Sequence, residues 1–367
     1  MPKIVLFGAT GYTGELTARA LAGRGLRPVL AARSQARVSA LAAELGLDYA
    51  TADVHSPRTV HRLVERGDVL VTTVGPFGRY GLPALEAAVG AGAHYLDSTG
   101  EPPFIREVFQ TWGPRARDAG SALLTAMGYD YVPGNLAGAL ALQDAGPAAT
   151  SLHIGYFIEG PARPGGMSGG TIASASGVIL DAGHTFADGR LRTERNGRRV
   201  RHFDVAGRSR PGLSLGATEQ FTLPRLHPQL GEVDVYLGWF GAASRALSLL
   251  SAPGALLFSV PPARTVARAA LARLLPGSTG GPSAEERPLR RGLAVAEARD
   301  DDGRLLSRVV LEGGDPYEFT AALLAWAAER CVDGAVSGTG ALGPVEAFGL
   351  DELVDGAHQA GMVVTEP

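Results

Sequence analysis

The sequence is poor in residues on which several kinds of site depend. Cys331 is its only cysteine, so no disulfide can form within the chain and no thiolate metal site is expected. We interpret Cys331 as a buried structural thiol because it falls near the end of an apolar, helix-like stretch. The only lysine is Lys3, which argues against a serine-tyrosine-lysine reductase site and against Schiff-base catalysis. We therefore expect a proton donor to be tyrosine, histidine, a carboxylic acid or water, and we expect no metal.

An excess of charge and a long unbroken apolar run are also absent. The 34 basic and 37 acidic residues give a net charge of -3, which offers no basis for nucleic-acid binding. Residues 246–263 carry no charge, but Pro253 and Pro261 interrupt them, so we expect a buried or interfacial segment and leave peripheral membrane contact open. The first apolar run is short and broken by Gly8, so we expect no secretory leader and a cytoplasmic protein.

The first third of the chain alternates strand and helix signals. Apolar, β-rich runs occur at residues 4–8, 28–33, 48–54, 68–76, 94–101 and 121–130. Helical patterns separate them, including residues 37–45, closed by Gly46, and residues 56–67, opened by Ser56. This alternation predicts a parallel sheet covered by helices on both faces, with ligands bound at the carboxyl ends of its strands. The 367 residues are enough for two domains.

Three glycines follow the first strand with the spacing G-x-x-G-x-x-G. We expect Gly8 to permit a sharp turn, Gly11 to let the backbone approach a pyrophosphate, and Gly14 to allow close packing of helix and strand. Amide groups at the start of the next helix would then face the phosphates. A strand, a glycine-rich turn and a helix at the start of an alternating chain favour a dinucleotide cradle over a turn without a ligand.

The end of the second strand indicates which dinucleotide binds. Enzymes that use NAD usually carry an acid there, whereas this chain has Arg33 and Ser34, with Arg37 one turn later. An arginine pairs with a 2′-phosphate and an acid would repel it, so we expect NADPH or NADP. Asp53, after the third strand, either accepts a hydrogen bond from the adenine or caps the next helix.

Four stretches near the strand ends carry a family resemblance. They are GATGYTG (8–14), VGPFGRYG (74–81), GAHYLDSTGE (92–101) and GYDYVPGNLAG (128–138). Their order and spacing resemble the saccharopine dehydrogenase-like reductases. Residues 168–179 and 338–349 are most similar to the trans-acting enoyl reductase subgroup of bacterial lipid and polyketide pathways. The resemblance covers nearly the whole chain. It implies a Rossmann domain interrupted by a substrate domain, NADP as cofactor, and hydride transfer to a C=C or C=N bond.

Candidate site residues follow from these stretches. The loop with Pro76 and Gly78 is expected to wall the ribose and nicotinamide. Residues 94–101 are placed at the carboxyl end of a strand and suit a nicotinamide edge or a substrate group, or else Asp97, Ser98 or Thr99 caps a helix. Residues 128–135 either supply a proton, from Tyr129, Asp130 or Tyr131, or form a hinge around a buried tyrosine. Of all candidates we expect Tyr129, Tyr80 or His94 to be catalytic. The expected cofactor-binding residues are Gly8, Ala9, Thr10, Gly11, Tyr12, Thr13, Gly14, Arg33, Ser34, Arg37, Asp53, Val74, Gly75, Pro76, Phe77, Tyr80 and Asp97.

The pattern changes after about residue 150. Strand signals and the Asn196-Gly197 and Asp302-Gly303 turns predict an α+β domain, and a helix at residues 168–183 would open on Ser168, Gly169 and Gly170. We divide the chain into a Rossmann domain (1–130), an α+β substrate and dimerisation domain (131–315) and C-terminal helices (316–367) that return to the Rossmann domain. The apolar stretch at 237–275 lines a substrate channel, forms a core with a dimer face, or touches a membrane.

These features predict a function in secondary metabolism. We expect an NADPH-dependent reductase of an activated C=C, such as an enoyl thioester on coenzyme A or a carrier protein, acting as a homodimer. An imine reductase of the saccharopine type is the alternative, in which Arg163, Arg225 or Arg245 would bind substrate carboxylates. A third alternative is an NADP-binding protein without turnover.

Overall fold

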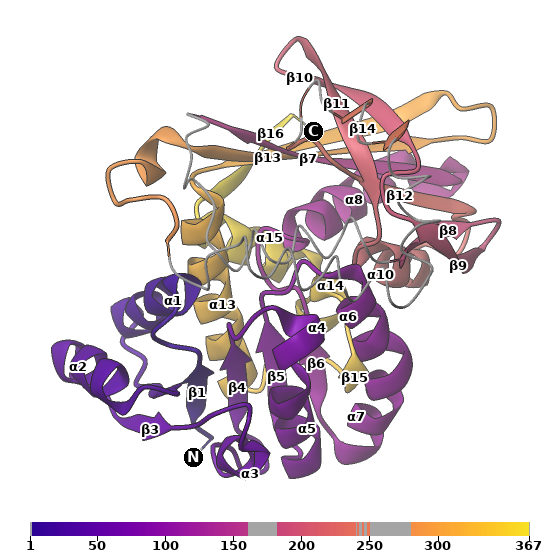
Figure 1. Cartoon of the computed structure of the whole chain (residues 1–367). Coiled ribbons are helices and arrows are strands. Elements are labelled where there is room, and N and C mark those ends of the chain that lie inside the picture. Colours follow the sequence, from indigo (N-terminus) through magenta and orange to yellow (C-terminus); the bar gives the residue numbers. More distant parts are fainter. Residues whose placement is uncertain are drawn as a thin grey trace.

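The structure is a computed structural model that describes residues 2–160, 182–239 and 280–366, together with residues 241, 244, 245, 248 and 249. Two sheets, one above the other in Figure 1, dominate it. Three features predicted from the sequence lie wholly or mostly outside these residues: the helix opening on Ser168, Gly169 and Gly170, Arg163, and the apolar stretch at 237–275.

The first sheet has seven parallel strands in the order β15-β6-β5-β4-β1-β2-β3. In that order its strands are Gly340–Ala341, Ala122–Leu124, His94–Asp97, Val69–Thr72, Ile4–Phe7, Val29–Ala32 and Tyr49–Thr51. Every residue of β1 and β4 is buried, as expected when helices cover both faces of a parallel sheet. The strands point towards the second sheet, so their carboxyl ends lie between the two layers (Figure 1).

Helices of this layer begin and end mostly where the local sequence predicts. They are α1 (Tyr12–Gly23), α2 (Gln35–Leu45), α3 (Pro57–His61), α4 (Phe77–Tyr80), α5 (Leu82–Ala91), α6 (Pro102–Glu107) and α7 (Gly113–Ala119), with a π-helical turn (Val108–Trp112) between α6 and α7. Gly46 ends α2 in the left-handed conformation, at φ 66°. The helix predicted at residues 56–67 is shorter than expected and ends at His61, and the Ser56 side chain makes no capping hydrogen bond.

The second sheet is mixed and has nine strands among the described residues. Seven of them run in the order β10-β11-β12-β7-β13-β14-β16, while β8 pairs with β12 and β9. The strands are β7 (Ser151–Glu159), β8 (Ala182–Ala187), β9 (Arg190–Arg195), β10 (Val200–Val205), β11 (Arg208–Leu215), β12 (Glu232–Leu237), β13 (Arg291–Arg299), β14 (Leu305–Gly313) and β16 (Met362–Glu366). Gly303 turns β13 into β14 as predicted. Asn196 and Gly197 also form a turn, but β9 and β10 do not pair, so it is not a hairpin.

One helix joins the two layers, and one face of the second sheet packs on it. Helix α8 (Val132–Ala145) follows β6 and lies beneath the second sheet (Figure 1). A Cβ atom at Gly138 would lie 3.1 Å from Leu152 and 3.4 Å from Ile154, so glycine lets α8 approach β7 closely. Phe157 and Phe203 pack on the opposite face of the sheet.

The C-terminal part returns to both sheets. Helix α13 (Pro316–Val332) packs against α1, where Arg24 pairs with Glu329 at 2.5 Å. β15 then extends the first sheet and β16 the second. Two helices of this part, α14 (Pro344–Phe348) and α15 (Leu350–Gln359), are separated by Gly349, whose φ is 82°. A parallel sheet interrupted by a mixed-sheet layer confirms the predicted fold class, while the domain boundaries stay a prediction.

Tyr129 ties the two layers together. Its buried hydroxyl donates to the Phe157 carbonyl at 2.6 Å and accepts from the Leu293 amide at 3.1 Å. These partners lie on β7 and β13, whereas Tyr129 itself follows β6. The link therefore fixes the position of α8 and of the residues that precede it.

We expect Tyr129→Phe to lower the free energy of unfolding by about 1–3 kcal/mol, because it leaves buried backbone groups of β7 and β13 without their partner. Urea unfolding measures the change, and Tyr49→Phe, on the exposed Tyr49, is the control. Unchanged stability together with lost turnover would instead assign Tyr129 to the chemistry.

Candidate cofactor site and active-site cleft

The glycine-rich turn after β1 forms a cradle for phosphates. Gly8 has a φ of 94°, which favours glycine. A Cβ atom at Gly14 would lie 2.1 Å from the Gly8 carbonyl oxygen, so only glycine allows α1 to start this close to β1. At Gly11 the nearest atom to such a Cβ is 3.4 Å away. The amides of Tyr12 and Thr13, in the first turn of α1, have no acceptor within the helix and suit a pyrophosphate.

The predicted residues of this turn have different tasks. Ala9 is buried and its amide bonds to Ala31, which fixes the turn to β2. The Thr10 carbonyl accepts from Arg37 at 2.6 Å. The Tyr12 hydroxyl donates to the Pro282 carbonyl at 2.6 Å, so the segment that leads into β13 lies against the start of α1.

The carboxyl end of β2 offers one guanidinium for a 2′-phosphate. Arg33 is exposed and forms no hydrogen bond or ion pair within the described part of the chain. Ser34 instead caps α2 by accepting from the Arg37 amide, and Arg37 supports Thr10. The Asp53 carboxylate accepts from the His55 amide at 2.9 Å in the turn before α3, whose N-cap is Ser56, so the predicted capping of that helix by Asp53 is wrong. Arg33 is thus the side chain here best placed to select the phosphate.

The loop after β4 is held by an acid from the neighbouring loop. Val74, Gly75 and Pro76 lead into α4, whose first residue is Phe77. The Glu101 carboxylate accepts from the amides of Phe77 at 2.7 Å and Gly78 at 3.0 Å. Glu101 thus caps α4 with its side chain. It also occupies the N-cap position of α6, so the capping of the next helix considered for Asp97, Ser98 or Thr99 is not what the described structure shows. The loop lies at the carboxyl edge of the sheet.

Asp97, at the end of β5, links the loop after β5 to the loop after β6. It is fully buried. Its carboxylate accepts from the Thr99 amide at 2.8 Å, the Ala126 amide at 2.9 Å and the Thr125 hydroxyl at 2.7 Å. Burial raises the pKa of Asp97 to about 6, although the three donors act against this rise. Because its oxygens already accept hydrogen bonds from protein groups, Asp97 holds together the loops at the carboxyl edge of the sheet.

The three predicted proton donors lie in different places. Tyr129 is buried behind the cleft and bonded to strands of the second sheet, which favours the hinge interpretation. His94 was expected at the carboxyl end of its strand, but this placement is wrong: His94 starts β5, opposite Val69, at the amino edge of the sheet. Its Nδ1 accepts from the Ala122 amide, and burial lowers its pKa. Tyr80 ends α4 with its ring edge-on to His55, at the carboxyl edge.

Asp130, one of the possible proton sources in the stretch 128–135, has an unusual environment. Its carboxylate lies against the loop after β5, where a Cβ atom at Gly100 would be 3.1 Å from Oδ2. Its Oδ1 is enclosed and has no hydrogen-bond partner within the described residues. Burial raises the pKa of Asp130 to about 7. The motif GYDYVPGN placed Asp130 at a strand end, but burial is not visible in a sequence.

Neither Glu219 nor Tyr156 was predicted from the sequence as a site residue. Glu219 begins α10 (Glu219–Leu226), is fully buried, and lies 2.6 Å from the Tyr156 hydroxyl. Burial raises the pKa of Glu219 to about 8, so the carboxyl is largely protonated at neutral pH. No local pattern marks either residue, since their contact joins parts of the chain 63 residues apart.

One mixed group of potential metal ligands occurs among the described residues, on the second sheet. His153, Glu232 and Asp234 place ligand atoms within 4.8 Å of one another. However, the Arg199 guanidinium pairs with Asp234 at 2.6 Å and already neutralises that carboxylate. A cation there would have to displace the arginine.

No helix in the described part of the chain combines the length and apolarity needed to cross a membrane.

Comparison with known proteins agrees with this geometry. Residues 4–124 match the family model of the saccharopine dehydrogenase NADP binding domain. Over its full length the chain superposes on apo saccharopine dehydrogenase (L-Glu forming) from Saccharomyces cerevisiae, with a TM-score of 0.61, 14% identity, and coverage of 100% of this chain and 99% of that one. This second similarity concerns the fold alone.

Similar sequences include proteins named as trans-acting enoyl reductases. One from Mycobacterium tuberculosis strain H37Rv is 40% identical over 197 residues, which are 49% of this chain and 44% of that protein. Another from Mycobacterium ulcerans is 40% identical over 141 residues, 36% of this chain and 34% of that protein. The matched regions span less than half of the length of these curated relatives. The resemblance stated from the sequence is confirmed, and NADP is the cofactor of residues 4–124.

We expect Arg33→Ala to weaken NADPH binding about 10- to 100-fold and to leave NADH binding unchanged, because it removes one charge-assisted contact to the 2′-phosphate. Nucleotide fluorescence titrations measure both affinities. Arg19→Ala, on the exposed side of α1, is the control and should change neither. An unchanged preference for NADPH in Arg33→Ala would contradict the assignment.

We expect Glu219→Gln to flatten the pH dependence of stability. A carboxyl whose folded pKa lies near 8 stabilises the fold below its unfolded pKa, near 4.5, and loses this contribution as pH rises towards 8. Between these values the wild-type protein should lose about 1.4 kcal/mol per pH unit from this group. Thermal unfolding from pH 5 to 9 measures the slope, with the exposed Glu352→Gln as control. Equal slopes for all three proteins would refute a buried, protonated Glu219.

Proposed function

We propose that this chain, whose residues 4–124 are an NADP-binding domain of the saccharopine dehydrogenase type, is an NADPH-dependent oxidoreductase that reduces an activated C=C bond. The observation that carries the proposal is the 40% identity to proteins named as trans-acting enoyl reductases, in a chain that has the cradle for the cofactor. NADPH bound in the cradle supplies the hydride. The protein orients the acceptor and supplies a proton.

The arrangement of loops supports this assignment. The amides at the start of α1 would hold the pyrophosphate, and Arg33 the 2′-phosphate. The nicotinamide would then lie towards the loops after β4, β5 and β6, where the carboxyl edge of the sheet faces the second layer (Figure 1). Those loops are linked by Glu101 and Asp97, which gives the cleft a rigid floor.

The imine alternative loses one of its three predicted cations. An amino-acid substrate would need a free cation for its carboxylate. Arg225, one of the candidates, donates to the Ala341 carbonyl at 3.1 Å, pairs with Glu346 at 3.4 Å and lies over the Phe109 ring. Its guanidinium is therefore already engaged. We further propose an apolar thioester substrate on coenzyme A or a carrier protein, a homodimer, and a cytoplasmic location.

The test is NADPH oxidation, followed by absorbance, with three mixtures: an enoyl thioester, a 2-oxo acid with an amine, and no acceptor. We expect oxidation with the enoyl thioester and a saturated product by mass spectrometry, with a rate lowered by Arg33→Ala at limiting NADPH. Oxidation only with the oxo acid and amine would assign the imine activity instead. Binding of NADPH without oxidation in any mixture would contradict reductase activity.

A further inference from the structure

Asp130 lies where three loops of the first sheet meet. Its Oδ2 faces the backbone of Gly100, and the next residue along, Glu101, holds the loop after β4. The Tyr131 hydroxyl donates to the Gly100 carbonyl at 3.3 Å, which fixes the two loops to each other. Because these loops follow adjacent strands at their carboxyl ends, the Asp130 carboxyl lies on the side of the sheet where a nicotinamide and its acceptor bind.

The Asp130 carboxyl differs from the other acid at this edge. Asp97 has three donors, whereas Oδ1 of Asp130 is enclosed without a partner within the described residues. An enclosed oxygen without a partner is costly as an anion, so the neutral acid is favoured. The residue as a whole is only partly buried, so its other oxygen, Oδ2, is the atom that a substrate can meet.

The backbone next to Asp130 is held by a buried clamp, formed by Tyr156 and Glu219. The Tyr156 hydroxyl accepts from the Gly134 amide at 2.8 Å and lies 3.0 Å from the Tyr131 carbonyl. Glu219 is 2.6 Å from the same hydroxyl. A Cβ atom at Gly134 would lie 2.2 Å from that hydroxyl oxygen, so the clamp fits closely around the first turn of α8.

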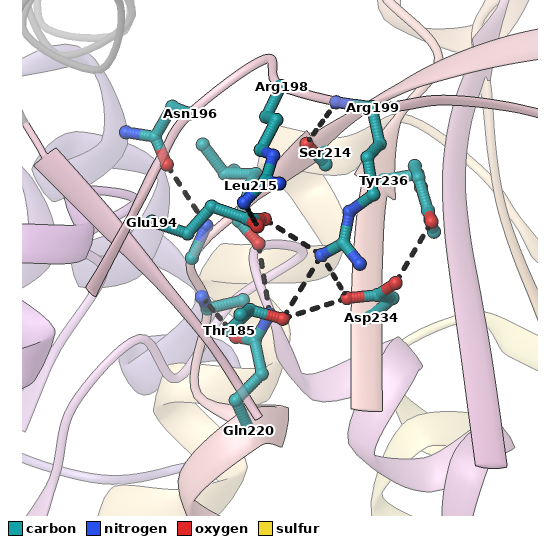
Figure 2. A network of polar contacts seen from close by, with 12 residues as sticks. Thr185, Glu194, Asn196, Arg198, Arg199, Ser214, Leu215, Gln220, Asp234 and Tyr236 are labelled. Atoms are coloured by element: carbon teal, nitrogen blue, oxygen red, sulfur yellow. Dashed lines mark hydrogen bonds and ion pairs between the residues drawn. The ribbon is translucent and has the colours of Figure 1, made fainter. Parts of the chain in front are cut away.

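A polar network in the second layer positions Glu219 in turn. The Arg199 guanidinium bridges Glu194, Asp234 and the Thr185 hydroxyl (Figure 2). The segment before α10 is fixed next to it: Asn196 accepts from the Gly216 amide at 3.2 Å, and the Gln220 side chain bonds both Ala217 and Leu215. Glu219 follows this segment directly, so its buried position is set by the second layer.

We propose that Asp130 is the proton donor of the reductase, and that Tyr156 and Glu219 are positioning residues that hold it in the cleft. This inference rests on the proposed function. As hydride adds to the β-carbon of the enoyl thioester, the electron pair of the C=C bond moves to the α-carbon. The α-carbon takes the proton of the Asp130 carboxyl, which leaves a carboxylate and a saturated thioester. The carboxylate then takes a proton from solvent.

The charges around Asp130 agree with this role. The titratable groups near it are Tyr129, Tyr131, Tyr156 and Glu219, and none of them is a cation. The Asp130 carboxyl forms no ion pair within the described residues. With a pKa of about 7, Asp130 is protonated below neutral pH and loses its proton above. A general acid must be protonated to act, so turnover should fall tenfold per pH unit above about pH 7.

The experiment measures turnover of an enoyl thioester by the full-length protein at saturating NADPH from pH 5 to 9. We expect Asp130→Asn to lower kcat about 100-fold or more, to abolish the fall above pH 7, and to leave the affinity for NADPH unchanged. In deuterated water the wild type should add deuterium to one face of the α-carbon, and Asp130→Asn to both. Asp144→Asn is the matched control, because Asp144 is exposed on α8, the helix that follows Asp130.

The pH profile of turnover in variants of Tyr156 and Glu219 tests the clamp separately. Tyr156→Phe should move the descending limb of the pH profile, while Glu219→Gln, which keeps the neutral form of the side chain, should retain it. A wild-type profile and facial selectivity in Asp130→Asn, or their loss in Tyr80→Phe instead, would overturn the assignment. No oxidation by the wild-type protein with any acceptor would remove the proposed function itself, and the role of Asp130 with it, which is a distinguishable result.

Discussion

The arrangement of the loops at the carboxyl edge of the first sheet depends on the buried carboxylate of Asp97. Backbone amides and a hydroxyl from two loops converge on it, and without these donors an acid with no exposed surface would be too costly to keep. Asp97 joins the loop after β5 to the loop after β6, and Glu101 joins the loop after β5 to that after β4. Through these two carboxylates, the loops after β4, β5 and β6 are joined into one surface. Loops usually carry function because a scaffold positions them, and here part of that scaffold is ionic.

The same edge carries two buried acids with different properties. Asp97 has its oxygens satisfied, and burial raises its pKa to about 6. Asp130 has an enclosed oxygen without a partner in the described structure, and burial raises its pKa to about 7. The number of donors around each carboxyl accounts for the order, because each hydrogen bond favours the anion. Two aspartates in one cleft can therefore be assigned separate tasks from their surroundings.

Local patterns predicted the first layer well. Alternating strand and helix signals, the glycine spacing and the Arg33 position depend on neighbours in sequence, so the parallel sheet and the cradle could be foreseen. His94 was misplaced because residues 94–101 were treated together as a strand end, whereas β5 begins at His94 and ends at Asp97. The Glu219 contact with Tyr156 joins two elements of the second layer, and only tertiary structure brings them together.

The first sheet takes strands from both ends of the chain, so it cannot be cut out as one continuous fragment. The region that matches the NADP-binding family ends at residue 124, yet β15, which covers the edge of β6, comes from Gly340–Ala341, and α13 covers α1. A fragment ending at residue 124 would expose the hydrogen-bonding edge of β6 and the apolar side of α1. A fragment that binds the cofactor therefore has to keep residues from the C-terminal part of the chain as well.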